Sequence, residues 1–581
     1  MPSDQERESI KAFLSPSEDL LNDLDRKILE LESNLARLKI QKQQLHEKIE
    51  PCRALVSTFR RLPDDILSEI FIQCLPQGVY ATLSPHDAPI LLTHVCNRWR
   101  NVAHSTPHLW SSLHIPVHPD SRFNALSEEA MVARDEHVNR WLLRAGSLPL
   151  SLSFCSPVDR AIGETSTQDL TRLIKQVPST SHGNWSDFTC TLWTAFQLSD
   201  GEPVFSFDHN ILTPLQRVPK LAMEISLRGV PLADAQEVAD AFLVLLDLKS
   251  NTQLRDLKLV MNRALFNIHT LTSYLPCSKL RTLDLQGICD SRNTPYVWHF
   301  IPAKIVALVR KCPNLVVFRV NVTQHLSEPG SRVILPHLKE LSYGFDDPRN
   351  DGPLQHISHL LMSPQYLSPL FDIGGPNLSS FHWRGRSPGL PIFSTYLGWI
   401  GLQLTSLCLD STFPISQILP LVPGLIQLHM ESKKDIFWDE LSDTGHDTRA
   451  EEEINSQVLQ LLTPQVEEED STPTSPPSHL CPRLQYLRWE GNVFFSEADL
   501  LIFLLQRAHS PRSLSPLKQV HIYFQRQRKA TIDIFSECAE LIRGGLDLRL
   551  IYGEMGERGR SGRSFDPKAA LPVDRDREFG W

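Results

Sequence analysis

The sequence lacks several features that mark secreted and membrane proteins. Its 11 cysteines include no CxxC pair, no histidine-containing cluster at zinc-like spacing and no even framework, which is typical of reduced, mostly buried thiols. The N-terminus, MPSDQERES, is polar and acidic, so no signal peptide is expected. No apolar run reaches the ~18 residues of a transmembrane helix. We therefore expect a cytoplasmic or nuclear protein that is not bound to a membrane.

A net positive charge is also absent. The formal net charge is −10, and residues 439–479 alone hold eleven of the 68 acidic residues but one of the 58 basic ones. The rest of the chain is therefore neutral, with 57 residues of each sign. A neutral body gives no support for nucleic acid or an anionic membrane as the main partner.

What the sequence has in quantity is length and proline. A chain of 581 residues exceeds one compact core and predicts either three or four units or an elongated repeat. Its 42 prolines predict many short elements with frequent chain reversals, while a hydrophobic content of 41% is enough to bury a core.

Apolar residues at heptad spacing follow the N-terminus. Ser15-Pro16-Ser17-Glu18 has the pattern of a capped helix start, and Pro51 is expected to end the helix. Lys42 fills one core position, and the others are apolar: Leu21, Leu24, Ile28, Leu31, Leu35, Leu38, Leu45 and Ile49. Four heptads with charged flanks predict a coiled coil. Two interpretations stay open: a homodimer through residues 17–50, or a helix that folds back on its own chain or stays single.

The densest pattern runs from Leu62 to Trp110. Leu62-Pro63 opens a predicted helix, because proline fits a first turn, and two aspartates follow where the helix dipole favours negative charge. Seven of the ten residues from 66 to 75 are apolar, an arc wider than the roughly 100° stripe of a helix that covers one core. A second predicted helix, Ile90–Ala103, can cover one face. The other face then needs a partner, unless the helix lies within a larger core.

This stretch, LPxxILxxIF followed by LxxVCxxWRxxA and PxLW, resembles an F-box, the motif that docks substrate receptors onto the Skp-type adaptor of cullin–RING ubiquitin ligases. The matching residues are Leu62, Pro63, Ile66, Leu67, Ile70, Val95, Cys96, Trp99, Arg100, Leu109 and Trp110. The loop between the two halves, 77–89, is longer than in compact examples. A heptad helix directly upstream is the layout of a large family of fungal F-box-like proteins. The resemblance implies adaptor contacts by Leu62, Pro63, Ile66, Leu67, Ile70, Leu92, Val95 and Trp99.

A second motif recurs further along the chain: leucine, two residues, an apolar residue, one residue and another apolar residue. Its nine copies begin at Leu254, Leu280, Leu315, Leu338, Leu378, Leu404, Leu425, Leu484 and Leu517. Spacings of 21 to 26 residues match a leucine-rich repeat, and longer ones hold insertions or degenerate copies. The helix predicted at 128–145, with Gly146 and the alternating strand LPLSLSF, looks like the first unit. Outer helices are predicted at 234–248, 303–311 and 497–508.

These patterns predict an α/β solenoid of irregular leucine-rich repeats, preceded by an all-α F-box and an N-terminal coiled-coil helix. The acidic segment 439–479 should be a disordered insert with a short helix near 454–462. The expected boundaries are a disordered 1–14, a coiled coil over 15–50, a linker over 51–61, the F-box over 62–113, the solenoid over 114–553 and a disordered tail over 554–581.

Alternate residues of each repeat strand face the side opposite the core. This predicts a polar surface of mixed charge made of Lys258, Asp284, Gln286, Arg319, Asn321, His382, Arg384, Asp410, His429, Glu431, Arg488, Glu490, His521 and Tyr523. The candidates for binding a protein target are Lys258, Arg319, His382, Arg384, His429, Arg488 and Tyr523. The alternative is an ordinary solvated face, with contacts made by the edge loops.

The sequence does not predict catalysis or a cofactor. Residues 385–389 spell GxSxG, but Pro388 stands where a serine hydrolase needs a backbone N–H for its oxyanion hole. The histidine pairs His104/His108, His114/His118 and His356/His359 have no nearby cysteine or carboxylate to complete a ligand set, so no metal site is predicted.

We therefore expect a non-catalytic substrate-recognition subunit of an SCF-type ligase, with the F-box on the adaptor and the solenoid on an unidentified protein target. The alternative is a leucine-rich-repeat scaffold whose F-box-like helices only cap the solenoid.

Overall fold

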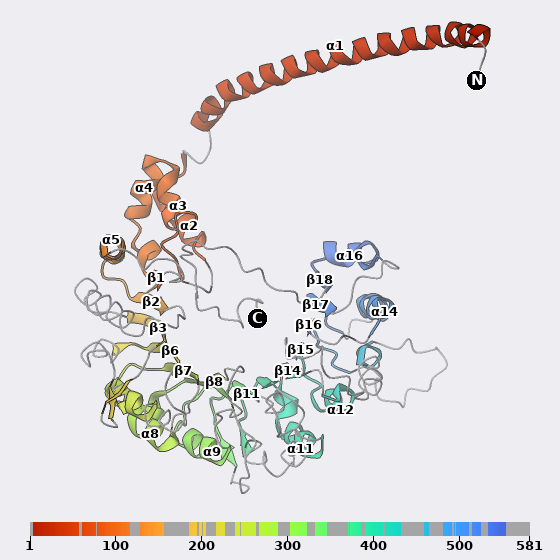
Figure 1. Ribbon diagram of the computed structural model, residues 1–581. Helices are drawn as coiled ribbons and strands as arrows, with labels where there is room; N and C mark the ends of the chain where they lie inside the picture. Colours follow the sequence, from red (N-terminus) through yellow and green to blue (C-terminus); the bar gives the residue numbers. More distant parts are fainter. Residues whose placement is uncertain are drawn as a thin grey trace, which may run out of the picture. The chain divides into compact units, whose positions relative to one another are not determined.

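The computed structural model divides into two units, Met1–Cys74 and Leu75–Trp581 (Figure 1). The division falls inside the predicted F-box. The residues that the structure describes are 4–56, 61–76, 78, 80–116, 128–155, 185–193, 197–199, 202–204, 217–226, 239–244, 246–262, 267–288, 302–321, 332–344, 370, 372–384, 390–410, 413–431, 458–463, 480–490, 493, 495–509, 514–524 and 533–552. The GxSxG segment, the predicted tail and most of the acidic insert lie outside these ranges. None of the described helices is long and apolar enough to cross a bilayer.

The first unit contains two helices, α1 (Asp4–Val56) and α2 (Asp64–Gln73). The predicted bounds of α1 were wrong at both ends: the helix begins at Asp4 rather than near Ser15 and continues past Pro51. Residues 4–14 are mostly strong helix formers without glycine or proline. An interior proline costs roughly 3 kcal/mol, which does not break a helix of 53 residues. Helix α2 begins as predicted, with Pro63 as its N-cap and two aspartates in its first turn.

The second unit begins with two short helices where one was predicted. These are α3 (Ile90–Val95) and α4 (Asn97–His104), separated by Cys96 in an extended conformation. The Sγ of Cys96 accepts a hydrogen bond from the backbone N of Trp99 at 3.5 Å, which caps α4. Arg100 Nε reaches back to the carbonyl of Thr93 at 2.9 Å. The break is therefore stabilised locally, and apolar spacing alone could not predict it.

A single parallel sheet of 14 strands forms the body of this unit. The order is β1-β2-β3-β6-β7-β8-β9-β11-β13-β14-β15-β16-β17-β18, so the strands lie side by side in the order in which they occur along the chain. The bounds are β1 Ser112–Pro116, β2 Leu150–Cys155, β3 Trp185–Trp193, β6 Lys220–Ser226, β7 Asp256–Asn262, β8 Thr282–Ile288, β9 Val317–Asn321, β11 Glu340–Gly344, β13 Ser380–Arg384, β14 Ser406–Asp410, β15 Gln427–Glu431, β16 Tyr486–Trp489, β17 Gln519–Phe524 and β18 Asp547–Tyr552. Short pairs β4–β5 (Gln197–Ser199, Glu202–Val204) and β10–β12 (Val333–Ile334, Ile373–Gly374) lie apart from this sheet.

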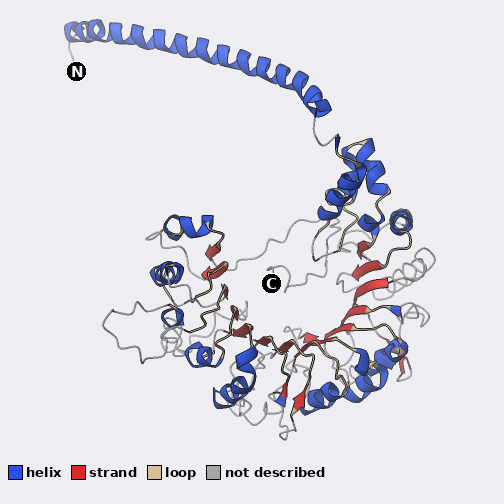
Figure 2. Ribbon diagram, turned by 180° about the vertical axis from the view of Figure 1, so that it is seen from behind, coloured by secondary structure: helices blue, strands red, loops and turns tan. Residues whose placement is uncertain are grey.

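The described helices cover one face of the sheet (Figure 2). The α-helices are α5 Glu128–Ala145, α8 Ile268–Tyr274, α9 Pro302–Arg310, α11 Leu390–Ile400, α12 Ile415–Ile418, α14 Glu497–Ala508, α15 Ile534–Glu537 and α16 Ala539–Arg543. The 3₁₀ turns are η2 Pro107–Trp110, η4 Leu248–Ser250, η5 Cys277–Lys279, η10 Gly401–Gln403 and η11 Leu419–Leu421. The predicted helices at 303–311 and 497–508 are confirmed to within a residue, whereas 234–248 is described only in part.

Each of the nine motif copies lies at a strand of the sheet. The second apolar residue of every copy is almost fully buried, and these residues pair in register across neighbouring strands, as Leu257 does with Leu283 and Leu283 with Phe318. The third forms a parallel buried row that includes Tyr343, Trp383 and Trp489. Residues at the same position of successive copies contact each other, so each inner strand packs against the strand before it and the strand after it. The buried rows therefore form one continuous core.

The motif missed five strands of the sheet, β1, β2, β3, β6 and β18, of which β2 was predicted from its alternating residues instead. In β3 and β6 the position of the first leucine is taken by Trp185 and Val218, which are buried in the same way. Any large apolar side chain fills this position, so a search for leucine was too narrow. The sheet also begins earlier than predicted, because β1 follows directly after Trp110.

The long loop within the F-box-like stretch has a structural role. The backbone N of His114 in β1 donates to the carbonyl of Ala81 at 2.7 Å, and Thr82 forms a parallel bridge with His114. The hydroxyl of Tyr80 donates to Asp187 Oδ1 in β3 at 2.5 Å, and burial raises the pKa of this tyrosine. The loop therefore covers the outer edge of β1.

Arg507 joins the helical turn at 458–462, which lies within the acidic insert, to residues 481–484, which follow the insert. Its guanidinium, on α14, donates to the carbonyls of Leu462 at 3.1 Å, Cys481 at 2.9 Å and Leu484 at 3.2 Å. A helical turn at 458–462 confirms the C-terminal part of the helix predicted within the insert.

Candidate functional site

The F-box-like helices carry both buried and exposed apolar side chains. Leu67 and Leu92 are 0% and 6% exposed, so both side chains belong to the interior in this structure, and their role as adaptor contacts stays a prediction. In the first unit Ile66 of α2 is 48% exposed. In the second unit Leu91 and Val95 of α3 are 44% and 55% exposed. Of the remaining candidates, Pro63 is exposed, and Leu62, Ile70 and Trp99 are half-buried.

The sheet presents a row of polar side chains on the face opposite the apolar rows, which we call the polar face. The strand registers align, from β7 to β17, Lys258, Asp284, Arg319, Ser342, His382, Cys408, His429, Arg488 and His521. The prediction that these alternate residues share one face is confirmed by the register. Two members of the row, Ser342 and Cys408, were not among the predicted residues.

Ion pairs occupy charged groups on this face, two of them between different strands. Arg319 Nε lies 2.6 Å from Glu340 Oε1, and Arg384 Nε lies 3.2 Å from Glu431 Oε2. Arg488 pairs with Glu490 and lies with its Cζ 5.7 Å from the centre of the Tyr523 ring. The polar face is therefore electrically balanced rather than basic.

Exposure separates the predicted target-binding residues. Lys258 is exposed, whereas Arg319, His382, Arg384, His429 and Tyr523 are partly buried. Arg488 is only 2% exposed, and its guanidinium joins the Glu490 carboxylate to the Tyr523 ring. Its role as a contact for a partner stays a prediction. Asp284 and His521 are also buried.

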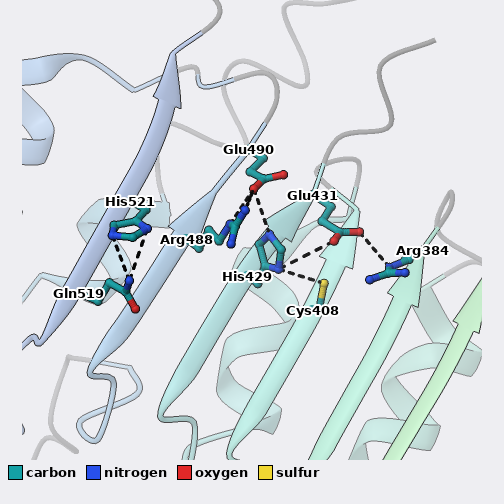
Figure 3. Close-up of polar contacts among 8 residues, drawn as sticks. All are labelled: Arg384, Cys408, His429, Glu431, Arg488, Glu490, Gln519 and His521. Atoms are coloured by element: carbon teal, nitrogen blue, oxygen red, sulfur yellow. Dashed lines mark hydrogen bonds and ion pairs between the residues drawn. The ribbon is translucent and has the colours of Figure 1, made fainter. Parts of the chain in front are cut away.

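His429 lies at the centre of the densest cluster of polar groups on this face (Figure 3). Its Nδ1 lies 3.5 Å from Cys408 Sγ and 3.9 Å from Glu431 Oε1, and its Nε2 lies 3.9 Å from Glu490 Oε1. Burial lowers the pKa of His429 well below its ordinary value, and the positive charges of Arg488 and Arg384 add to this effect. The imidazole is therefore neutral at neutral pH and keeps a lone pair for a proton or a metal ion.

A second polar group lies further along the sheet. His521 Nε2 is 2.9 Å from Asp547 Oδ2 in β18, and the Gln519 amide is 3.0 Å from the same ring nitrogen. Burial is the main cause that lowers the pKa of His521. No nucleophile is among these contacts, so the arrangement holds two strands together rather than activating a group.

A basic groove along the N-terminal ends of β7, β8, β9 and β11 was missed by the sequence analysis. Its volume is about 660 Å³, and the nine described residues that line it are Arg255, Ser278, Lys279, Arg281, Asn314, Val316, His337, Lys339 and Asn377, with no carboxylate among them. Arg255, Arg281 and Lys339 each follow the first leucine of a motif copy. A basic residue directly after the first leucine of the motif was the sequence signal that could have revealed the groove. The groove can accept the carboxylates or phosphates of an acidic segment.

Comparison of the chain with models of protein families and with curated proteins finds no match.

Proposed function

We propose that the protein is a non-catalytic substrate-recognition subunit of an SCF-type cullin–RING ubiquitin ligase. In this proposal the F-box-like helices dock on a Skp-type adaptor, and the sheet holds a protein target. Such a receptor raises the effective concentration of the target beside the transferase and needs no chemistry of its own.

The observation that carries the proposal is the exposure of Ile66, Leu91 and Val95. Each is a large aliphatic side chain at least 44% exposed, on a short helix that also carries buried apolar residues, Leu67 and Phe71 in α2 and Leu92 in α3. Burying one such side chain on binding is worth roughly 1.5–3 kcal/mol. The F-box resemblance implies contact with the adaptor at Ile66 and Val95. Leu91 is next to Leu92, at which the resemblance also implies contact.

For the target we propose the accessible part of the polar face, Lys258, Arg319, His382, Arg384 and Tyr523, together with the basic groove. The alternative is a leucine-rich-repeat scaffold that binds proteins without an adaptor. The two functions differ in one observable, the co-purification of a Skp-type adaptor.

Replacing Ile66 by aspartate is expected to reduce adaptor binding at least tenfold, because a charge then faces an apolar partner surface. A tenfold loss corresponds to about 1.4 kcal/mol. The measurement is a titration of purified full-length protein with a Skp-type adaptor. Because Ile66 is 48% exposed, the melting temperature should stay unchanged.

Glu69→Gln, an exposed substitution on the same helix, is the matched control and should bind like the wild type. Leu67→Ala should instead destabilise the fold, since Leu67 is fully buried. Wild-type protein that binds no adaptor, or an Ile66→Asp variant that binds as well as wild type, would support the scaffold function instead.

We also propose that α1 forms a parallel coiled coil with a second copy of the chain. Its heptad residues are the reason: between Leu21 and Ile49 the apolar core positions are 44% to 68% exposed on the single helix. The contact would run over the four heptads between residues 17 and 50, which at 1.5 Å per residue is ~50 Å of helix.

Two leucines of nearly equal exposure test this dimer. Leu31 lies in the heptad seam and is 68% exposed, while Leu29 lies outside it and is 67% exposed. Light scattering should give twice the 66.0 kDa chain mass for the wild type. Leu31→Asp should raise the dissociation constant at least tenfold, and Leu29→Asp should leave it unchanged. Equal effects of the two substitutions, or a monomeric wild type at micromolar concentration, would contradict the dimer.

A further inference from the structure

Three potential metal ligands from two adjacent strands converge on the polar face. Cys408 belongs to β14, and His429 and Glu431 belong to β15 (Figure 3). One ligand atom from each lies within 4.8 Å of the other two. The chain places Cys408 and His429 21 residues apart, without the short spacing of known zinc motifs, which is why the sequence did not reveal them.

The distances suit a zinc ion. A tetrahedral site with a Zn–S bond of about 2.3 Å and a Zn–N bond of about 2.0 Å places sulfur and nitrogen about 3.5 Å apart. Cys408 Sγ and His429 Nδ1 are 3.5 Å apart. The corresponding N–O separation is about 3.3 Å, and His429 Nδ1 lies 3.9 Å from Glu431 Oε1. A small rotation of the glutamate side chain closes this difference.

The surrounding charges hold the ligands in the orientation a metal requires. Arg384 Nε lies 3.2 Å from Glu431 Oε2, which leaves Oε1 on the side of His429. Glu490 Oε1 lies 3.9 Å from His429 Nε2. A histidine that binds metal usually directs its other ring N–H at a carboxylate, which fixes the tautomer and the ring orientation. Glu490 has this position when Nδ1 is the ligand.

The net charge of the cluster also accommodates a divalent cation. Two arginines, Arg384 and Arg488, repel a cation, but each is paired with a glutamate. Binding a metal converts the Cys408 thiol into a thiolate and releases its proton. A neutral imidazole is the form of histidine that coordinates a metal ion. Thiolate, imidazole and carboxylate together favour Zn²⁺ over Mg²⁺ or Ca²⁺.

We propose that Cys408 Sγ, His429 Nδ1 and Glu431 Oε1 bind one Zn²⁺ ion, with water as the fourth ligand. The ion joins β14 to β15 on the polar face. Glu431 and His429 side chains are 27% and 18% exposed, so the fourth position is open to solvent and to a ligand group of a partner. This site does not depend on the adaptor proposal.

The test uses the full-length protein after removal of metal by a chelator. Titration with Zn²⁺ alone should show one ion per chain, and Co²⁺ should give the near-ultraviolet thiolate-to-cobalt absorption band. Cys408→Ser should abolish that band and weaken Zn²⁺ binding at least 100-fold, and His429→Gln should weaken it similarly. His521→Gln and Cys538→Ser, which alter a histidine and a cysteine outside the cluster, should bind as the wild type does.

The wild-type spectrum decides the proposal even if a variant fails to fold. A Co²⁺ complex without the thiolate band, or no Zn²⁺ binding at micromolar concentration, would overturn it. Equal Zn²⁺ affinity of the wild type and a folded Cys408→Ser variant would do the same.

Discussion

Arg507→Met is expected to lower the free energy of unfolding of the C-terminal part of the sheet by about 3 kcal/mol. Methionine has a similar length but no donor, so the carbonyls of Leu462, Cys481 and Leu484 lose their hydrogen bonds. The arginine is 3% exposed. Burial lowers its pKa to about 10, so it is charged at neutral pH and its hydrogen bonds are of the stronger, charge-assisted kind.

Urea unfolding followed by circular dichroism measures this effect. Arg507→Lys should have an intermediate stability, because an ammonium group keeps the charge but cannot reach all the carbonyls at once. Gln506→Met, an exposed neighbour on α14, is the matched control. If Arg507→Met unfolded at the wild-type urea concentration, the arginine would not stabilise the contact between residues 458–462 and 481–484.

Trp110→Ala is expected to cost about 3–5 kcal/mol in the first part of the second unit. Trp110 is 1% exposed, and its Nε1 donates to the carbonyl of Ala103 at 2.8 Å. Its ring meets the Trp141 ring edge-on at a centroid distance of 4.8 Å, and the Arg144 guanidinium lies 4.6 Å from its centre. The side chain therefore connects α4 to α5, and its loss leaves a cavity between them.

Hydrogen exchange measures the loss of stability separately for each helix and strand. Amides in α4, α5, η2 and β1 should exchange at least 100-fold faster in Trp110→Ala, since each 1.4 kcal/mol is about tenfold. Trp110→Phe keeps the ring contact with Trp141 but loses the hydrogen bond, so its effect should be smaller. Exchange that rose in α4 but not in α5 would mean that the two helices unfold independently.

The strands of the sheet could be predicted because their signal is local. Each motif copy holds its own buried residues, and the period of two assigns alternate residues to opposite faces. This was enough to place Leu257, Phe318 and Leu428 in the core and Lys258, Arg319 and His429 on the other face. The motif did not identify the strands in which another residue type takes the place of the first leucine, as Trp185 and Val218 do.

The pairing of charges could not be predicted from the sequence. Arg384 and Glu431 are on β13 and β15, two strands apart, and their contact depends on loop lengths that set which strands are neighbours. The same is true of Cys408 and His429. Which side chains are buried within the F-box-like stretch could not be predicted for a related reason. The pattern identified Leu67 and Ile66 as apolar but did not indicate which of them faces inward.

The two edge strands of the sheet, β1 and β18, are protected in different ways against pairing with a strand of another chain. An edge strand presents unpaired N–H and C=O groups on which another chain can add a strand and begin to aggregate. At β1 this edge is bridged by Thr82. In the described part of the chain no strand follows β18, whose Asp547 and Arg549 form an ion pair at 3.1 Å and put charge on the edge. A chain shortened to end before Asp547 would make β17 the edge instead. Its residues Val520, Ile522 and Phe524 are apolar, so the charged last strand protects the protein against self-association.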